Sequence, residues 1–215
     1  MKEIIQELKN FLKPKDIGTD SDRALLLDFQ ATLEIKPEKA IKLEKDALAQ
    51  IENITADNAR LVSNLHANLG GLYRMNGHPD LAREHMEKSI SLLDQFNLLH
   101  INDSIPQIAN YAMFLTEQQE PERGISELQK LSGIIKEYHS DDCLDYAKVQ
   151  ETLGTIYLMT ANLSQAKTHF KRAFKIYEKI WADEPEMIEA KYQEIQELYP
   201  QIGFSIGKTL SGLLT

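Results

Sequence analysis

The carboxyl-terminal segment contains one stretch whose residue types could bind phosphate. Gly203 to Thr209 reads Gly-x-x-x-Gly-Lys-Thr, and a glycine-rich loop followed by Lys and Thr can cradle a phosphate with its backbone amides. The run is one residue shorter than the nucleotide-binding loop, Ile202 stands where the first glycine should be, and no buried strand precedes it. We therefore interpret the match as a coincidence and expect no cofactor.

Histidines and carboxylates form no catalytic or metal-binding pattern either. No two of the six histidines lie three or four residues apart on one helix, and none neighbours a cysteine or a pair of carboxylates in a metal-ligand pattern. His85 and His169 are 84 residues apart, at equivalent positions of an internal repeat, which explains their recurrence. Asp141 and Asp142 lie at a helix start, where capping explains them. Because no nucleophile and base can be paired, we expect a protein that is not an enzyme and binds no metal.

Composition restricts the partners and the compartment. The formal net charge of −9 opposes binding to nucleic acid, which depends on clustered Lys and Arg. The closest approach to a basic stripe is interrupted by Glu178, and we interpret it as a solvated helix face; it consists of Lys167, Lys171, Arg172, Lys175 and Lys179. No stretch reaches the roughly 20 apolar residues of a membrane span. The single cysteine, Cys143, fits a reducing compartment, and the first residues are too charged for a secretion signal. We expect a cytoplasmic protein.

The elements that must position any site repeat every 42 residues. Gly70 and Gly154 lie two periods apart, and each opens the run Gly-x-x-Tyr, followed by Ala and then a large apolar residue at fixed offsets. The same register holds four times, with the small position at Asp28, Gly70, Ala112 and Gly154 and the large position at Glu44, Met86, Leu128 and Phe170. A fixed period of this length predicts an array of identical supersecondary units.

Each period contains two apolar stripes of helical spacing, separated by a polar turn. The second repeat predicts a helix over 59–75 that ends at Asn76-Gly77-His78, and another that starts at Pro79. The equivalent position is occupied by Pro37, Pro79 and Pro121, since proline at the first helical position loses no hydrogen bond. Each proline is followed by an acidic residue, which the positive end of the helix dipole favours. In the fourth repeat Leu163 takes the position, and Asn162 is the predicted cap.

Small residues should let the two helices of each unit approach closely. Beyond them, two columns at 42-residue intervals extend every second helix by about two turns; the columns are Ile51, Leu93, Ile135 and Tyr177, and Ile54, Phe96, Tyr138 and Ile180. The first repeat departs from the pattern, since Asp28 replaces the glycine and Glu44 the aromatic residue.

Leu69-Gly70 with Tyr73, and Leu153-Gly154 with Tyr157, resemble the tetratricopeptide repeat, and the 42-residue length resembles its kinesin light chain class. The resemblance implies an all-α fold, a right-handed superhelix of antiparallel helix hairpins. We expect an amino-terminal capping helix over 1–19 and four repeats over 20–184. The repeats span about 20–56, 57–98, 99–140 and 141–184, and 185–215 would form a degenerate fifth unit and a carboxyl-terminal capping helix.

The first helices of such an array line a concave groove. Counting from the small position predicts a peptide-binding set of Asn68, Gly71, Arg74, Met75, Asn110, Met113, Thr152 and Thr155, and we add Lys148 to this set as a second cation. In the kinesin light chain class, asparagines at the position of Asn68 and Asn110 pair with the backbone of an extended peptide, so the resemblance implies this role for these two. Arg74 and Lys148 would attract an acidic group, and methionines would grip side chains.

We therefore expect a non-catalytic module that binds a peptide or protein segment, without nucleic acid or membrane partners. Two alternatives remain open. The chain could be a peptide-responsive signalling regulator that sequesters a partner. It could also be a structural protein that forms a homodimer through the unusually apolar residues 202–214.

Overall fold

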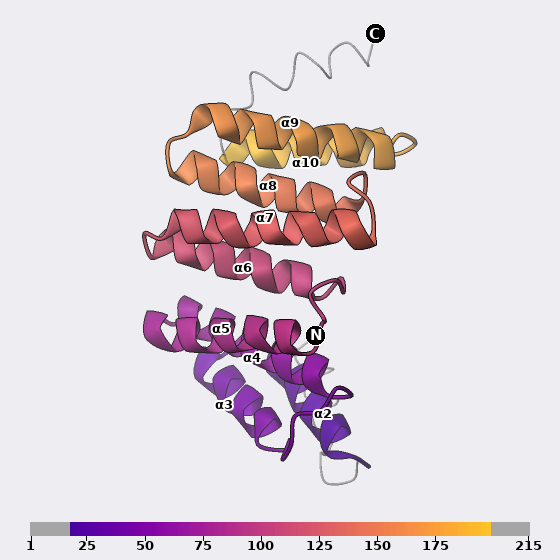
Figure 1. The fold of residues 1–215 in the computed structure, drawn as a ribbon. Helices are drawn as coiled ribbons and strands as arrows, with labels where there is room; N and C mark the ends of the chain where they lie inside the picture. Colours follow the sequence, from indigo (N-terminus) through magenta and orange to yellow (C-terminus); the bar gives the residue numbers. More distant parts are fainter. Residues whose placement is uncertain (1–17, 199–215) are drawn as a thin grey trace. The chain divides into compact units, whose positions relative to one another are not determined.

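The part of the chain that the structure describes contains nine helices, as the helical periodicity of the sequence predicts. The computed structural model describes residues 18–198, and no strand occurs among them. The helices are α2 (Asp20–Thr32), α3 (Pro37–Leu48), α4 (Ala59–Met75), α5 (Pro79–Gln95), α6 (Ser104–Glu117), α7 (Pro121–Tyr138), α8 (Leu144–Met159), α9 (Leu163–Ile180) and α10 (Pro185–Leu198). The prediction of an all-α chain of helical hairpins is confirmed (Figure 1).

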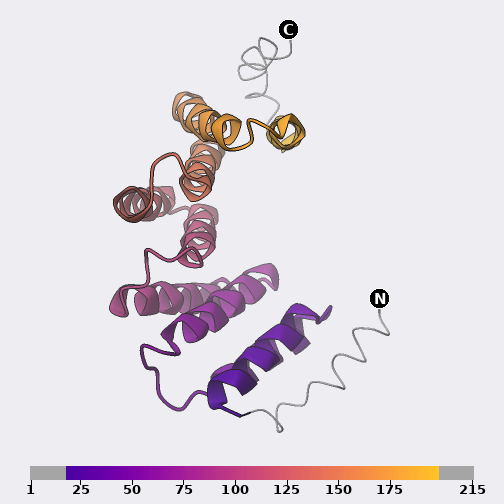
Figure 2. The same cartoon turned by 90° about the vertical axis from the view of Figure 1, so that its right-hand side faces the viewer.

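The chain divides into two compact units, residues 1–111 and 112–215, and the division falls inside α6. In the first unit, α2 packs against α3 and α4 packs against α5. In the second unit, α8 packs against α9, while α7 contacts α8 and α10 contacts α9. Figure 2 shows the helices of the second unit nearly end on, with α10 beside α9. Turns of three or four residues join α2 to α3, α4 to α5 and α8 to α9, so the two helices of each of these hairpins are antiparallel.

The helices begin as predicted, with a proline at the first position or with a side-chain cap. Pro37, Pro79 and Pro121 are the first residues of α3, α5 and α7, and each is followed by an acidic residue in the first turn. In α9, where Leu163 replaces the proline, Asn162 caps the helix because its side chain accepts a hydrogen bond from Gln165 N (3.2 Å). Both predictions are confirmed.

Helix ends share a left-handed residue at the 42-residue interval. Gly77, Gln119 and Ala161 have φ values of 75°, 65° and 59°. Each lies just beyond the end of α4, α6 or α8, and the amide that follows it donates to a carbonyl five residues back. These hydrogen bonds are His78 N to Tyr73 O (2.9 Å), Glu120 N to Leu115 O (2.8 Å) and Asn162 N to Tyr157 O (2.7 Å). The left-handed residue thus ends the first helix of each hairpin and turns the chain into the second.

Close approach at the small positions is also confirmed. A Cβ at Gly70 would lie 2.5 Å from Met86 Cγ, and one at Gly154 would lie 3.0 Å from the Phe170 ring. In α7, a Cβ at Gly124 would lie 2.6 Å from the carbonyl oxygen of Ala112. The helices can therefore pack at this distance only because these side chains are absent.

The first hairpin is shorter than predicted. The helix α3 ends at Leu48, so the expectation that every second helix extends by about two turns is wrong for this repeat. Beyond α3, Asn58 holds the chain in a turn: its Nδ2 donates to Asn53 O (2.9 Å), and its Oδ1 accepts from Thr55 N (2.8 Å). This turn replaces the helical continuation that α5, α7 and α9 have.

At the other end, α10 packs on the second unit's core through Ile195, which is 2% exposed. Ile195 joins a cluster with Leu158, Phe170 and Phe174, so α10 covers the last hairpin of the described chain. The predicted capping helix over 1–19 begins outside the described residues. The phosphate-loop-like run and the apolar segment 202–214 lie outside them as well.

Candidate functional site

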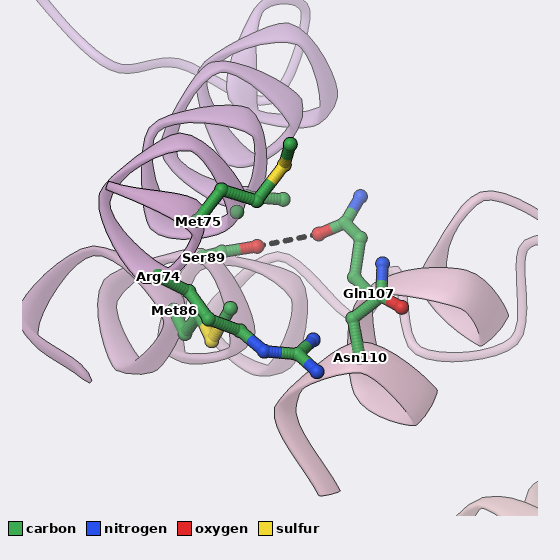
Figure 3. Close-up of a pocket in the computed structure, with 8 residues that line it drawn as sticks. Arg74, Met75, Met86, Ser89, Gln107 and Asn110 are labelled. Carbon is green, nitrogen blue, oxygen red and sulfur yellow. Dashed lines mark hydrogen bonds between the residues drawn. The ribbon is translucent and has the colours of Figure 1, made fainter. Parts of the chain in front are cut away.

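The first unit contains a pocket with a volume of about 190 Å³ between α4, α5 and the first turns of α6. Its lining consists of Ala67, Gly71, Arg74, Met75, Met86, Ser89, Gln107 and Asn110 (Figure 3). Four predicted site residues are therefore brought together here, namely Gly71, Arg74, Met75 and Asn110. We call this site the α4–α6 pocket.

One side of the α4–α6 pocket is soft and apolar. Met75 is 81% exposed at the end of α4, whereas Met86 of α5 is buried. Gly71 leaves open space, since a Cβ there would meet no atom within 4 Å. Methionine side chains adapt to varied apolar partners, so this side can accept side chains of different shapes.

The pocket also carries polar groups. Arg74 extends from the last turn of α4, and Asn110 extends from α6 into the same opening (Figure 3). Asn110 is exposed and makes no hydrogen bond to the described residues. An amide side chain both donates and accepts, and a guanidinium binds carboxylates. The pocket thus presents a donor, an acceptor and a positive charge beside apolar surface.

A buried hydrogen-bond network fixes the floor of the pocket. Ser63 Oγ donates to Gln107 Oε1 (2.8 Å) and lies 3.1 Å from Ser89 Oγ. Ser89 Oγ also donates to Gln107 Oε1, and Gln107 Nε2 donates to Asn64 Oδ1. Because the network joins α4, α5 and α6 and its polar groups are satisfied, it holds the three helices in one arrangement.

Sequence reasoning missed Gln107 and Ser89, although a signal was present. One period away from Gln107 stand Leu65 and Val149, which are fully buried, and one period after Ser89 stands Leu131. A polar residue at a position that is apolar in other repeats is therefore the sequence signal that could have predicted this network.

Asn68 is exposed, but its amide is engaged within the chain. Asn68 Nδ2 donates to Asp28 Oδ1 (2.8 Å) and to Glu44 Oε1 (3.3 Å). These carboxyl groups occupy the small and large positions of the first repeat, where the other repeats pack apolar groups. Glu44 is 1% exposed, and burial together with the negative charge of Asp28 raises the pKa of Glu44 to about 9. We call Asp28, Glu44 and Asn68 the acidic triad.

The remaining predicted site residues belong to the second unit, outside the α4–α6 pocket. Met113 is half-buried, and Lys148 is exposed with its Nζ 3.9 Å from Asp145. Thr152 and Thr155 are half-buried, and their hydroxyl groups donate to the carbonyls of Lys148 (3.0 Å) and Glu151 (3.1 Å) within α8.

The two recurrent histidines stack on the tyrosines of the Gly-x-x-Tyr motif. The ring of His85 lies 5.5 Å from that of Tyr73, and the ring of His169 lies 5.2 Å from that of Tyr157. His85 Nδ1 lies 2.8 Å from His66 Nδ1, whereas His169 Nδ1 lies 2.9 Å from Gln150 Oε1. Burial lowers the pKa of all three histidines, and burial with the charge of His85 lowers that of His66 to about 4.

Single residues that stand out in the sequence have structural roles. Cys143 is half-buried and caps α8, since its Sγ accepts from Tyr146 N (3.4 Å). Over residues 18–198, no cluster of three or more His, Cys, Asp or Glu side chains is arranged to hold a metal. Within the same range, no helix is both long enough and apolar enough to cross a membrane.

Comparisons with known proteins agree with this architecture. Residues 104–179 match the family model described as tetratricopeptide repeat. The crystal structure of BtubC (BKLC) from P. vanneervenii is 18% identical with a TM-score of 0.69, and the match covers 93% of this chain and 80% of that one. A Podosopora anserina putative kinesin light chain structure of nearly identical TPR-like repeats is 13% identical with a TM-score of 0.70, covering 84% and 88%. MamA is 16% identical with a TM-score of 0.55, covering 81% and 87%. No curated protein matches the sequence.

Identities of this size establish the fold and not the activity. The predicted resemblance to the tetratricopeptide repeat is confirmed by the match over 104–179 and by the shared fold. Residues 104–179 therefore match the tetratricopeptide repeat family, and the fold is similar to that of kinesin light chain-like TPR repeat proteins.

Proposed function

We propose that this chain is a non-catalytic interaction module that binds an extended peptide segment of a partner protein in the α4–α6 pocket. Tetratricopeptide repeats are generally protein–protein interaction modules. The observation that carries the proposal is the pairing, in one pocket, of the exposed Asn110 amide with the apolar surface of Met75 and Met86.

The mechanism follows from what each side of the pocket offers. The Asn110 amide donates to and accepts from the backbone of an extended peptide, whatever the peptide sequence. Met75 and Met86 contact one apolar side chain of the peptide, in the space that Gly71 leaves open. The Arg74 guanidinium favours a peptide with a carboxylate next to that apolar residue.

The rigid floor favours binding because little has to be ordered when the peptide arrives. The network of Ser63, Ser89 and Gln107 already fixes α4, α5 and α6. Preorganisation of this kind lowers the entropic cost of association. Asn68 is a weaker candidate than Asn110 because its Nδ2 already donates to two carboxyl groups, although Oδ1 could still accept from a peptide. The roles of Lys148, Thr152, Thr155 and Met113 stay predictions.

The test is the affinity of the whole chain for a peptide selected from a random library. Gly71→Leu should fill the pocket and weaken the peptide at least tenfold in a fluorescence anisotropy titration. Gly133→Leu is the matched control, because Gly133 is also a helical glycine at which a Cβ would meet no atom within 4 Å, and it lies on α7. Equal affinities for the two variants would remove the pocket from the proposal.

We also propose a cytoplasmic location, supported by the single cysteine and by the chain's acidic, charged composition. Fractionation of cells that express the tagged chain tests this, and recovery in a secreted or membrane fraction would contradict it.

A further inference from the structure

The second unit contains a hollow of about 390 Å³ where the end of α7, the start of α8 and the middle of α9 meet. Its lining consists of Lys136, Asp141, Asp142, Tyr146, Lys171, Arg172, Lys175 and Ile176. We call this site the basic hollow. It shares no residue with the α4–α6 pocket, and the sequence pattern alone predicts only a solvated helix face for its α9 cations.

Positive charge exceeds negative charge at the basic hollow. Lys136 Nζ lies 3.6 Å from Asp141, and Lys179, next to the lining, is ion-paired with Asp142. Hydrogen bonding and charge from Lys179, together with the charge of Lys175, lower the pKa of the Asp142 carboxyl. Both carboxylates thus have a cation, and three cations of the lining remain beyond these pairs: Lys171, Arg172 and Lys175. This surplus lies in a chain whose formal net charge is −9.

The three surplus cations are exposed on adjacent turns of α9. Lys171 and Lys175 are four residues apart, so their like charges repel each other on one helix face. Neither lysine makes a hydrogen bond or a close ion pair with the described residues. Arg172 makes only a long contact, from Nη1 to Gln150 Oε1 (3.5 Å). A bound anion would relieve the repulsion, and these side chains can turn toward it without breaking a strong contact.

The hollow also has a fixed apolar wall. Tyr146 and Ile176 line it and are 3% and 4% exposed, so they are held by the core of the unit. Lys136 Nζ lies 5.2 Å from the centroid of the Tyr146 ring, a cation–π contact that keeps this lysine at the edge. A ligand therefore meets apolar surface and positive charge together, as a peptide with side chains of both kinds requires.

We propose that the basic hollow binds a short acidic peptide segment of a partner protein, with Lys171, Arg172 and Lys175 as the charged contacts. A peptide is favoured over a nucleic acid because a long polyanion would extend beyond the hollow over an acidic chain. At physiological salt, charges are screened beyond about 8 Å, so a short segment experiences mainly the local positive charge. An anionic membrane is disfavoured for the same reason, since a flat surface would extend beyond the hollow over a chain of net charge −9.

A fluorescein-labelled peptide with four consecutive glutamates and one flanking leucine is the probe, and its glutamine counterpart is the ligand control. The whole chain should bind the glutamate peptide at least tenfold more tightly, with an affinity that falls as salt rises. Lys171→Glu with Lys175→Glu should abolish this preference. The double variant Lys39→Glu with Lys42→Glu on α3 has the same change in net charge and should retain most of the preference for the glutamate peptide.

Three results would overturn the proposal: equal losses in the two double variants, no preference for glutamate, or tighter binding of single-stranded oligonucleotides that compete with the peptide. If charge reversal unfolds the chain, the double variant Lys171→Gln with Lys175→Gln tests the same loss of preference for the glutamate peptide. Circular dichroism checks that this variant is folded. Gly71→Leu, which fills the α4–α6 pocket, should leave the glutamate peptide bound. Failure at one site is therefore distinguishable from failure at the other.

Discussion

Asn68 of α4 and Asp28 of α2 are joined by a hydrogen bond of 2.8 Å from Asn68 Nδ2 to Asp28 Oδ1. The same Nδ2 also donates to Glu44 of α3, so one amide connects three helices of the first unit. At this place the other repeats pack a small residue against a large apolar one. The acidic triad thus performs with hydrogen bonds what Gly70 and Met86 perform by close packing.

Asn68→Ala should lower stability, whereas Asn110→Ala should not. Loss of the Asn68 amide leaves two neighbouring carboxyl groups without their shared donor, at a cost of about 1–3 kcal/mol. Asn110 is exposed and makes no hydrogen bond to the described residues, so its replacement should change stability by less than about 0.5 kcal/mol. Urea denaturation at pH 7 measures both. Equal stability of the two variants would show that the triad is not a structural support.

Glu44→Gln should reduce the loss of stability that accompanies a rise in pH above about 4.5. The pKa of Glu44 is raised to about 9, so the folded chain keeps a proton that the unfolded chain releases above about 4.5. Stability therefore falls as pH rises from about 4.5 to about 9, and a glutamine has no proton to release. Between pH 5 and pH 8 the variant should lose about 2–4 kcal/mol less than the parent chain. Parallel pH profiles of the two chains would contradict a buried, protonated Glu44.

His66→Gln should weaken acid sensitivity. Burial and the charge of His85 lower the pKa of His66 to about 4, so the unfolded chain binds a proton below about 6.5 that the folded chain resists. Stability is therefore lost as pH falls from about 6.5 toward 4. Gln150 stands at the equivalent position of the fourth repeat, where it lies 2.9 Å from His169 Nδ1, so glutamine should fit. From pH 7 to pH 5 the variant should retain about 1–2 kcal/mol that the parent chain loses. The measurement is thermal unfolding across this range, and identical slopes would refute the assignment.

Two glycines of α7 should respond to alanine in opposite directions. A Cβ at Gly124 would lie 2.6 Å from the Ala112 carbonyl oxygen, so Gly124→Ala should destabilise the second unit by about 1–3 kcal/mol. A Cβ at Gly133 meets nothing within 4 Å, and Gly133→Ala should stabilise the helix by up to about 1 kcal/mol. Chemical denaturation compares the variants, and a neutral Gly124→Ala would show that α6 and α7 can move apart without loss.

The sequence predicts the hairpins well because the same residue types recur every 42 residues, so several repeats indicate the same packing contact. The start of α5 at Pro79 and the close approaches at Gly70, Gly124 and Gly154 follow from it. The early end of α3 could not be predicted, since Ile51 and Ile54 fit the apolar columns. Beyond Leu48 the chain instead enters a turn that the side chain of Asn58 holds by hydrogen bonds to Asn53 and Thr55.

The site was harder to predict than the fold because hydrogen-bond partners come from different helices. The spacing places Asn68 and Asn110 in equivalent positions, but only the structure shows that the amide of Asn68 meets Asp28 and Glu44. Gln119 and Ala161 are not glycines, so their residue types do not predict a left-handed backbone. Only their spacing of 42 and 84 residues from Gly77 could have predicted it.

Photo-cross-linking from the α4–α6 pocket tests the central claim most directly. A benzoylphenylalanine at Met75, which is 81% exposed, should form an adduct with a library-selected peptide, and Asn110→Ala should reduce its yield at least several-fold. The same group at Ile35, which is 78% exposed and does not line the pocket, should form little adduct. Comparable adducts at both positions, or an adduct at Ile35 alone, would contradict peptide binding in this pocket.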